Sequence, residues 1–211
     1  MTKQCLKTLL VYGLLLAFIG SLPVFAAQAK KADKEILKNI KYREIGPTRE
    51  SGRFVDIAWN EKEPNTFYCA TGSGGLWKTT NNGISFEALF TNEPVFSLGD
   101  VEVAPSDPSI VWVGTGEATN SRSTYWGNGV YKSTDAGKTW THMGLDESHH
   151  IGAIVIHPKN PDIVYVAALG HLYSENPDRG LYKTTDGGKT WEKVLGVVVK
   201  GKHIGVVDCV M

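Results

Sequence analysis

The side chains best suited to ligand recognition gather in one long polar loop near the middle of the chain. An aromatic pair beside polar groups can stack on the face of a sugar ring or grip a peptide. An equally good explanation is that the tryptophan folds back as a lid packed on the fold, and the sequence leaves both interpretations open. The candidate ligand-binding residues of this loop are Glu117, Asn120, Arg122, Tyr125 and Trp126.

Loop carboxylates could supply acid–base chemistry. Glu117, Glu175 and Asp178 include a possible pair of the kind that hydrolyses glycosidic bonds. Solvated surface acids are the commoner explanation, so we predict no catalytic residue in this chain. The sequence also lacks a phosphate-binding loop, a dinucleotide fingerprint, a Cys-x-x-Cys pair and a Gly-x-Ser-x-Gly elbow, and we predict no cofactor.

Three histidines in the same set of loops could bind a metal ion, since imidazole is a common metal ligand. However, His149, His150 and His171 lack the spacing of a ligand motif. We therefore predict ordinary exposed histidines and no metal. His149 and His171 are added to the ligand-binding candidates, together with Tyr173 and Arg179.

An internal repeat of about fifty residues must position these loops. An octapeptide, Ser/Thr-x-Asp-x-Gly-x-Thr-Trp, occurs at 133–140 and 184–191, and a degenerate copy occurs at 79–86. Each copy follows a short aromatic strand, and a Pro turn between two further strands comes earlier in each repeat. Four antiparallel strands per repeat predict the blades of a β-propeller.

The predicted fold class is all-β, an incomplete β-propeller that follows an N-terminal signal helix. Three blades and the first strand of a fourth do not close a ring, so we expect the chain to be a truncated N-terminal part of a larger protein. The propeller region is predicted at 42–211, with blades at 52–92, 96–145 and 150–196 and the start of the next at 203–211.

The octapeptide has a structural explanation. Its Asp can accept hydrogen bonds from the backbone of its own turn, its Gly supplies a shape that a Cβ would resist, and its Trp packs on the fold. A catalytic group would not need repeating in every blade. We therefore predict structural roles for Asn81, Gly83, Asp135, Gly137, Trp140, Asp186, Gly188 and Trp191.

Loops of the predicted blades sort onto two faces, because antiparallel strands alternate in direction. One face holds the Pro turns and the octapeptides. The other face holds the loops from strand two to strand three and from one blade to the next, and their lengths vary as those of binding loops do. All the candidate ligand-binding residues fall on this second face.

The N-terminus is typical of an export signal. Two lysines precede an almost wholly apolar segment at 9–25, and small residues follow it. We predict a signal peptide at 1–29, a charged linker at 30–41 and a periplasmic, extracellular or cell-surface protein without a membrane span after cleavage. An uncleaved anchor helix is the alternative, and Pro23 would interrupt it.

The amino-acid composition restricts the classes of molecule that this chain can bind. The chain has 22 Lys+Arg and 22 Asp+Glu, and this balance excludes a nucleic-acid binder held by a broad basic surface. Export favours an oxidising compartment, yet Cys69 and Cys209 lie in apolar runs where buried thiols are expected. The sequence leaves open whether these two cysteines pair.

The octapeptide resembles the Asp-box, or bacterial neuraminidase repeat, and the resemblance extends over 42–211. The stretches at 45–58, 72–83 and 151–171 are similar to secreted bacterial proteins with a sortilin-type N-terminal propeller, which are often labelled glycosyl hydrolase-like. The sortilin-type resemblance implies binding rather than chemistry. The Asp-box itself is specific for the fold and nearly silent on function.

Two enzyme families with Asp-boxes imply more specific sites. Sialidases use an arginine cluster introduced by a Phe/Tyr-Arg-Ile-Pro motif, and this motif is absent from the sequence. The resemblance to propeller-type xyloglucanases places one catalytic Asp of that family at Gly72, which carries no acid group. The second carboxylate of that family would lie in a second propeller.

We therefore predict an exported propeller module that acts as a scaffold binding a protein, a peptide or a glycan. The alternative is a glycan-active hydrolase, xyloglucanase-like or sialidase-like, whose catalytic residues lie largely in blades outside this sequence. The residues do not identify an individual ligand.

Overall fold

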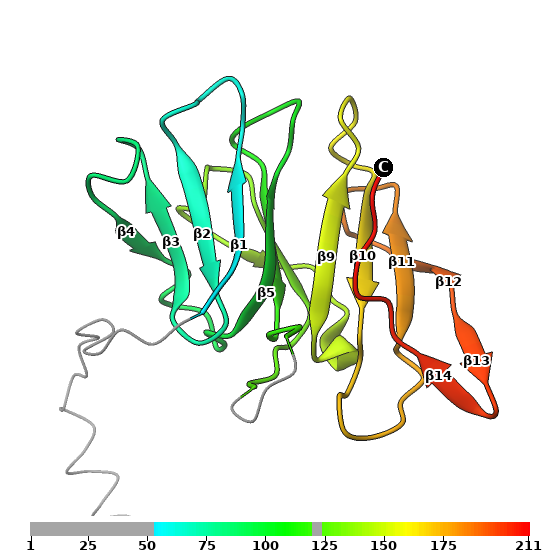
Figure 1. Cartoon of the computed structure of the whole chain (residues 1–211). Coiled ribbons are helices and arrows are strands. Elements are labelled where there is room, and N and C mark those ends of the chain that lie inside the picture. Colours follow the sequence, from blue (N-terminus) through cyan, green and yellow to red (C-terminus); the bar gives the residue numbers. More distant parts are fainter. Residues whose placement is uncertain (1–52, 120–123) are drawn as a thin grey trace, which may run out of the picture. The chain divides into compact units, whose positions relative to one another are not determined.

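The computed structural model describes residues 53–119 and 124–211. The predicted signal peptide, the linker and the candidates Asn120 and Arg122 lie outside these ranges. The described chain forms three four-stranded antiparallel sheets and a two-stranded hairpin (Figure 1). No helix among the described residues is both long enough and apolar enough to cross a membrane.

Each four-stranded sheet pairs its strands in chain order, which is the arrangement of a propeller blade and confirms the predicted fold class. Blade one consists of β1 (Phe54–Trp59), β2 (Phe67–Thr71), β3 (Gly75–Thr79) and β4 (Glu87–Leu89). Blade two consists of β5 (Leu98–Val103), β6 (Val111–Thr115), β7 (Val130–Ser133) and β8 (Thr141–His142). Blade three consists of β9 (Ile151–Ile156), β10 (Val164–Ala168), β11 (Gly180–Thr184) and β12 (Glu192–Leu195).

The hydrophobic core lies between the blades, and β6 shows why. All five of its residues are buried, and successive side chains of a strand point to opposite faces. Val111 and Val113 join the cluster shared with blade one, whereas Trp112 joins the cluster shared with blade three. A blade with two apolar faces is therefore stabilised only when neighbours cover both of them.

The first strands of the three blades lie side by side, with β5 between β1 and β9 (Figure 1). Close approach of blades two and three depends on Gly114 in β6. A Cβ on Gly114 would lie only 2.4 Å from Cγ2 of Ile151 at the start of β9. The glycine is therefore required by packing across this blade boundary.

The octapeptides form tight, self-bonded turns. Asp135 accepts hydrogen bonds from the Thr139 backbone N–H at 2.9 Å and from its hydroxyl at 2.6 Å, and Ser133 Oγ lies 2.8 Å from Asp135 Oδ1. The hydrogen bonds from Thr139 and Ser133 lower the pKa of Asp135 to about 2. Asp186 and Thr190 repeat the arrangement in blade three, and the pKa of Asp186 is lowered for the same reason.

The octapeptide tryptophans reach across to the preceding blade. Trp140 of blade two lies edge-to-face with Phe90 of blade one, with ring centroids 5.3 Å apart. Trp191 of blade three lies edge-to-face with Trp112, and its indole N–H donates to the Met143 carbonyl at 2.7 Å. Each turn therefore helps to fix its blade onto the one before it.

The last residues differ in part from the predicted first strand of a fourth blade at 203–211. β14 (Lys202–Ile204) pairs with β13 (Val197–Val199) in a hairpin, and 205–211 form no strand. This segment runs beside blade three, where the Val206 N–H donates to the Ala168 carbonyl at 3.1 Å. A first strand pairs with the second strand of its own blade, and no such strand lies among the described residues.

Cys69 and Cys209 are free thiols in the structure. Cys69 is buried in β2, and burial raises the pKa of its thiol. Burial and the nearby charge of Asp208 raise the pKa of Cys209 to about 11. Both side chains therefore stay protonated at neutral pH and behave as small hydrophobic groups.

Candidate functional site

Three loops of the predicted binding face come together around one aromatic stack. Trp126 comes from the β6–β7 loop, His149 from the β8–β9 connection and His171 from the β10–β11 loop. The rings of His149 and His171 are stacked with centroids 3.6 Å apart, and Trp126 stacks on His149 at 6.4 Å. We call these three residues the loop-face stack.

The aromatic side chains of this face are largely exposed. Trp126 is 69% exposed, so it does not fold back as a buried lid. Tyr125 is exposed as well and lies against exposed Phe96, with ring centroids 5.3 Å apart. Exposed aromatic rings in clusters are unusual on soluble proteins and mark surfaces that bind ligands.

Glu117 is placed differently from the sequence-based expectation of a loop acid. Its side chain is fully buried, and both of its oxygens accept hydrogen bonds from Arg53, Oε1 from Nε at 2.7 Å and Oε2 from Nη2 at 2.5 Å. This two-pronged pairing supplies the opposite charge that a buried carboxylate requires. Glu117 therefore anchors the loop from below instead of facing a ligand.

The Glu117 carboxyl group fills the space above Gly72 at the end of β2. A Cβ on Gly72 would lie 2.7 Å from the Glu117 Cδ. Ser97 ties the same region together, because its hydroxyl donates to the Gly72 carbonyl at 2.8 Å and lies 3.0 Å from the Tyr125 carbonyl. Gly72 thus lies beneath a neighbouring acid group, at the position where the resemblance to xyloglucanases expected a catalytic Asp.

Arg179 and Tyr173, two further ligand-binding candidates, belong to the β10–β11 loop. The Arg179 guanidinium donates to the backbone carbonyls of His203, His171 and Ser174, so it holds the β10–β11 loop in place. Tyr173 is strongly exposed on that loop. Glu175 of the same loop pairs with His203, whose Nδ1 lies 2.7 Å from the Glu175 Oε1.

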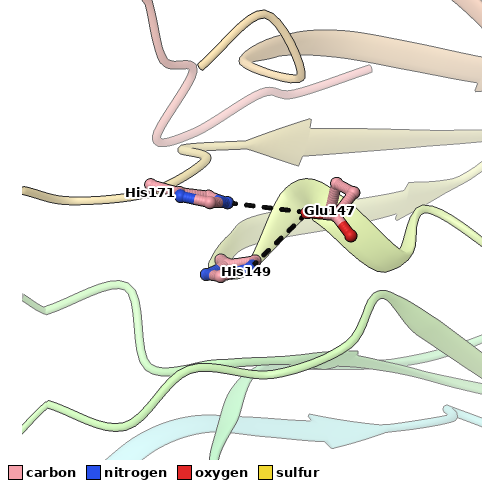
Figure 2. Close-up of side chains that lie close together, drawn as sticks. All are labelled: Glu147, His149 and His171. Carbon is pink, nitrogen blue, oxygen red and sulfur yellow. Dashed lines mark ion pairs between the residues drawn. The ribbon is translucent and has the colours of Figure 1, made fainter. Parts of the chain in front are cut away.

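Sequence reasoning did not single out Glu147, which faces both histidines of the stack (Figure 2). Glu147 Oε2 lies 3.9 Å from His149 Nε2 and 3.8 Å from His171 Nε2. Burial and the neighbouring His171 lower the pKa of His149, which keeps its ring neutral near pH 7. His150 is buried, its Nδ1 lies 2.9 Å from the Glu117 carbonyl, and burial lowers its pKa as well.

A second group of acids lies on the inner strands and was also not predicted. Asp56 of β1 accepts a hydrogen bond from the Val101 backbone N–H at 3.3 Å, and Asp100 of β5 accepts one from the Ile154 N–H at 2.6 Å. Burial, together with the charge of Asp56, raises the pKa of Asp100 to about 9. The same causes raise the pKa of Glu102 to about 7. Asp56 and Asp100 therefore join neighbouring blades through hydrogen bonds from the backbone.

The three loop carboxylates that the sequence singled out are each engaged by a neighbouring side chain. Glu117 is neutralised by Arg53, and Glu175 pairs with His203. Asp178 Oδ2 accepts a hydrogen bond from the Asn176 side chain at 3.2 Å. What the loop face offers among these residues is an exposed aromatic surface beside histidines and the exposed carboxylates of Asp146 and Glu147, a combination suited to binding.

Comparisons with known proteins agree with this architecture. The BNR/Asp-box repeat model matches 131–142 and 182–193. A probable oligoxyloglucan-reducing end-specific xyloglucanase of Neosartorya fischeri is 29% identical over 143 residues, which cover 65% of this chain and 16% of that protein. A xyloglucanase of Hypocrea jecorina is 28% identical over 172 residues, covering 72% of this chain and 19% of that protein.

Similarity to solved structures supports the fold alone. The crystal structure of an ancestral GH74 enzyme superposes with a TM-score of 0.55 at 20% identity, over 69% of this chain and 18% of that one. The chain spans less than a fifth of the length of the curated relatives named above. It is a protein of propeller blades that carry BNR/Asp-box repeats, as the sequence predicted, and it fits the Asp-box propeller superfamily.

Proposed function

We propose that this chain is the glycan-recognising part of an exported, xyloglucanase-like propeller, and that its described residues bind the glycan without cleaving it. The observation that carries the proposal is the exposed loop-face stack in a chain whose relatives include xyloglucanases. The sequence-based alternatives of a peptide or protein ligand become outcomes of the test.

Stacking on the aromatic surface is the proposed binding interaction. A sugar ring presents an apolar face of C–H groups and a rim of hydroxyls, and the exposed indole of Trp126 offers a flat partner for that face. Neighbouring Glu147 and His171 offer acceptors and donors for the rim. Tyr125 of the β6–β7 loop and Phe96 of the β4–β5 connection extend the aromatic surface.

We do not assign cleavage of a glycosidic bond to the described residues, for a chemical reason. A hydrolase needs two carboxyl groups that flank the bond, about 5–5.5 Å apart in retaining enzymes and about 6.5–9.5 Å apart in inverting ones. Glu117 is fully buried and engaged by Arg53, and Gly72 has no side chain. A hydrolytic full-length protein would therefore draw its carboxylates from residues other than these.

Calorimetric titration of the full chain with xyloglucan oligosaccharides tests the proposal. The matched variants are Trp126→Ala on the loop face and Trp59→Ala. Trp59 is the last residue of β1, away from the loop face, and its side chain has a similar exposure of 61%. We expect Trp126→Ala to weaken binding at least tenfold, as the loss of one stacked aromatic predicts, and Trp59→Ala to leave it unchanged.

Three outcomes would overturn the proposal. Absence of binding to any xyloglucan fragment would remove its basis. An equal loss of glycan affinity in both variants would show that the binding surface is not confined to the loop face. Selective binding of a peptide library in place of the oligosaccharides would favour the scaffold interpretation that the sortilin-type resemblance suggested.

A further inference from the structure

We infer that Glu147, His149 and His171 form a binding site for a divalent transition-metal ion, with Zn²⁺ as the best-suited ion (Figure 2). Each of the three residues offers one ligand atom, and the three atoms lie within 4.8 Å of one another. The inference stands on this geometry. Glu147 and His171 also belong to the proposed glycan surface, but zinc binding is measured without any glycan, so the two proposals can fail separately.

Donor chemistry selects the class of ion. Two imidazole nitrogens and one carboxylate oxygen are a ligand set that suits Zn²⁺ and other borderline ions, whereas Ca²⁺ and Mg²⁺ prefer oxygen ligands throughout. Two ligand atoms on a tetrahedral zinc ion lie about 3.4 Å apart, given bonds of about 2.1 Å. The Glu147 Oε2 distances of 3.9 and 3.8 Å to the two Nε2 atoms are close to this value. The two imidazole rings are stacked 24° from parallel, so they must rotate before both lone pairs point at one ion.

An unsatisfied buried nitrogen points to a missing partner. His171 Nε2 is buried and has no hydrogen-bond partner among the described residues. Its other ring nitrogen, Nδ1, lies 3.1 Å from the Ser174 hydroxyl, which orients the imidazole. A buried polar atom without a partner is costly, and a metal ion on Nε2 would satisfy it while Ser174 held the ring from behind.

The backbone around the cluster is built to present its side chains. Asp146–Ser148 forms a single 3-10 turn, η1, which places Glu147 and His149 two residues apart on either side of buried Ser148. Leu145 and His149 flank the turn with φ angles of 63° and 54°, a region that non-glycine residues seldom occupy. Strained residues of this kind persist where the surrounding structure holds them, and they gather at functional sites.

Two contacts bring the second histidine to this turn. The Leu169 N–H donates to the His150 carbonyl at 2.9 Å, and this bond joins the end of β10 to the start of β9. The Asn176 side chain donates to the Glu147 carbonyl at 3.2 Å, which ties the β10–β11 loop onto η1. His171 is therefore delivered to the cluster by a braced loop.

Three protein ligands leave the fourth position of a tetrahedral ion open. The Glu147 side chain is 70% exposed, so the open position faces solvent on the side of the loop face. Trp126 stacks on the opposite part of the cluster through His149. A water molecule, or a hydroxyl of a bound molecule, is the ligand that such an open position accepts.

Titration of the EDTA-treated full chain with ZnCl₂ by calorimetry tests the inference, with CoCl₂ as a spectroscopic probe of tetrahedral coordination by visible absorption. We expect one ion per chain. His171→Asn and Glu147→Gln should each weaken zinc binding at least tenfold, since each removes one of three ligands. The matched control is His142→Asn, because His142 also faces a carboxylate, Asp146 Oδ1 at 3.7 Å, but has no second histidine beside it.

Further variants keep the test decisive if a ligand substitution disturbs folding. His171→Cys supplies a different zinc ligand at the same place, so it should restore binding that His171→Asn loses. Melting curves in EDTA report whether each variant is folded without metal. The inference is overturned if the full chain binds no zinc, or if His142→Asn weakens binding as much as His171→Asn does.

Discussion

The carboxyl group of Glu117 lies directly over the backbone of Gly72, so that a Cβ on Gly72 would come within 2.7 Å of the Glu117 Cδ. The acid of blade two thus occupies the space that a side chain at the end of β2 in blade one would need. This relationship gives a packing reason for a glycine at this position, although its φ angle does not require one. The same packing leaves no room at position 72 for the carboxylic side chain that the resemblance to xyloglucanases led us to expect there.

Gly72→Asp should destabilise the chain, because the new side chain would meet Glu117 and place two carboxylates side by side. Overpacking of this kind costs about 1–3 kcal/mol. Thermal unfolding followed by circular dichroism measures the effect. The double variant Gly72→Asp/Glu117→Ala should recover part of the loss, since it restores both the space and a single negative charge beside Arg53. A single variant that melts like the native chain would contradict the packing described here.

The Arg53–Glu117 pair should behave as one unit. Arg53→Lys keeps the positive charge but loses the fork that contacts both Glu117 oxygens, so it should lower the melting temperature. Arg53→Ala should lower it further, because it leaves the buried carboxylate without a partner. In a double-mutant cycle with Glu117→Ala, the two losses should be strongly non-additive. Additive losses would show that the pair contributes little.

The inner-strand acid Asp100 should make stability depend on pH. Its pKa is about 9 in the folded chain and 3.8 ordinarily, so between these values the folded state holds a proton that the unfolded state has released. The stabilisation is complete below pH 3.8 and is lost as the pH rises through 9. The free energy of unfolding should therefore fall with pH across this window, by at most about 1.4 kcal/mol per pH unit.

Asp100→Asn should reduce this slope, because the amide has no proton to release, and its oxygen can still accept from the Ile154 N–H. Glu102, whose pKa is raised to about 7, should still contribute a fall of stability between pH 4.5 and 7. Urea unfolding at several pH values measures the difference between variant and native chain. Asp107→Asn is the matched control, since hydrogen bonds from Ser109 lower the pKa of Asp107 and place its own effect below this window. Identical slopes for the native chain and Asp100→Asn would refute the assignment.

Gly114→Ala tests the boundary between blades two and three. Its new methyl group would collide with Ile151, and a cost of about 1–3 kcal/mol is expected. Ile151→Ala should destabilise by itself through the cavity that it leaves, by about 2–5 kcal/mol. The glycine substitution should cost less in the Ile151→Ala background, because the nearest clashing atom, Cγ2, is gone and of the Ile151 side chain only Cβ, at 2.7 Å, remains. Equal costs in both backgrounds, measured by urea unfolding, would argue against the contact.

The strands and turns of the blades were predictable because their signals are local. The aromatic strand before each octapeptide corresponds to β3, β7 and β11, and the run ending in Val-Gly-Thr corresponds to β6. The fourth strands are short, down to the two residues Thr141–His142 in β8. These strands lie at the open edge of each sheet, where only one neighbour supplies hydrogen bonds.

The site was only partly predictable because its contacts join distant residues. Tyr125, Trp126, His149 and His171 were recognised from their loops, and the alternation of strand directions explains why three of those loops meet. Arg53 lies 64 residues before its partner Glu117, and no local pattern announces that pair. In the sequence Glu147 looks like an ordinary solvated loop acid. Only the structure shows that the turn η1 orients its carboxylate toward two imidazoles.

The backbone hydrogen bonds of the inner-strand acids run from one blade to the next blade along the chain. Asp56 and Asp100 each reach forward to a backbone N–H of the following blade, but the residue in the same register of β9 is Ala153, which has no acceptor. Segment 205–211 is attached to blade three through a backbone bond at Val206 instead. If the chain is pulled from its ends, segment 205–211 should therefore detach from blade three first. The boundaries between blades one and two and between blades two and three should separate at higher force.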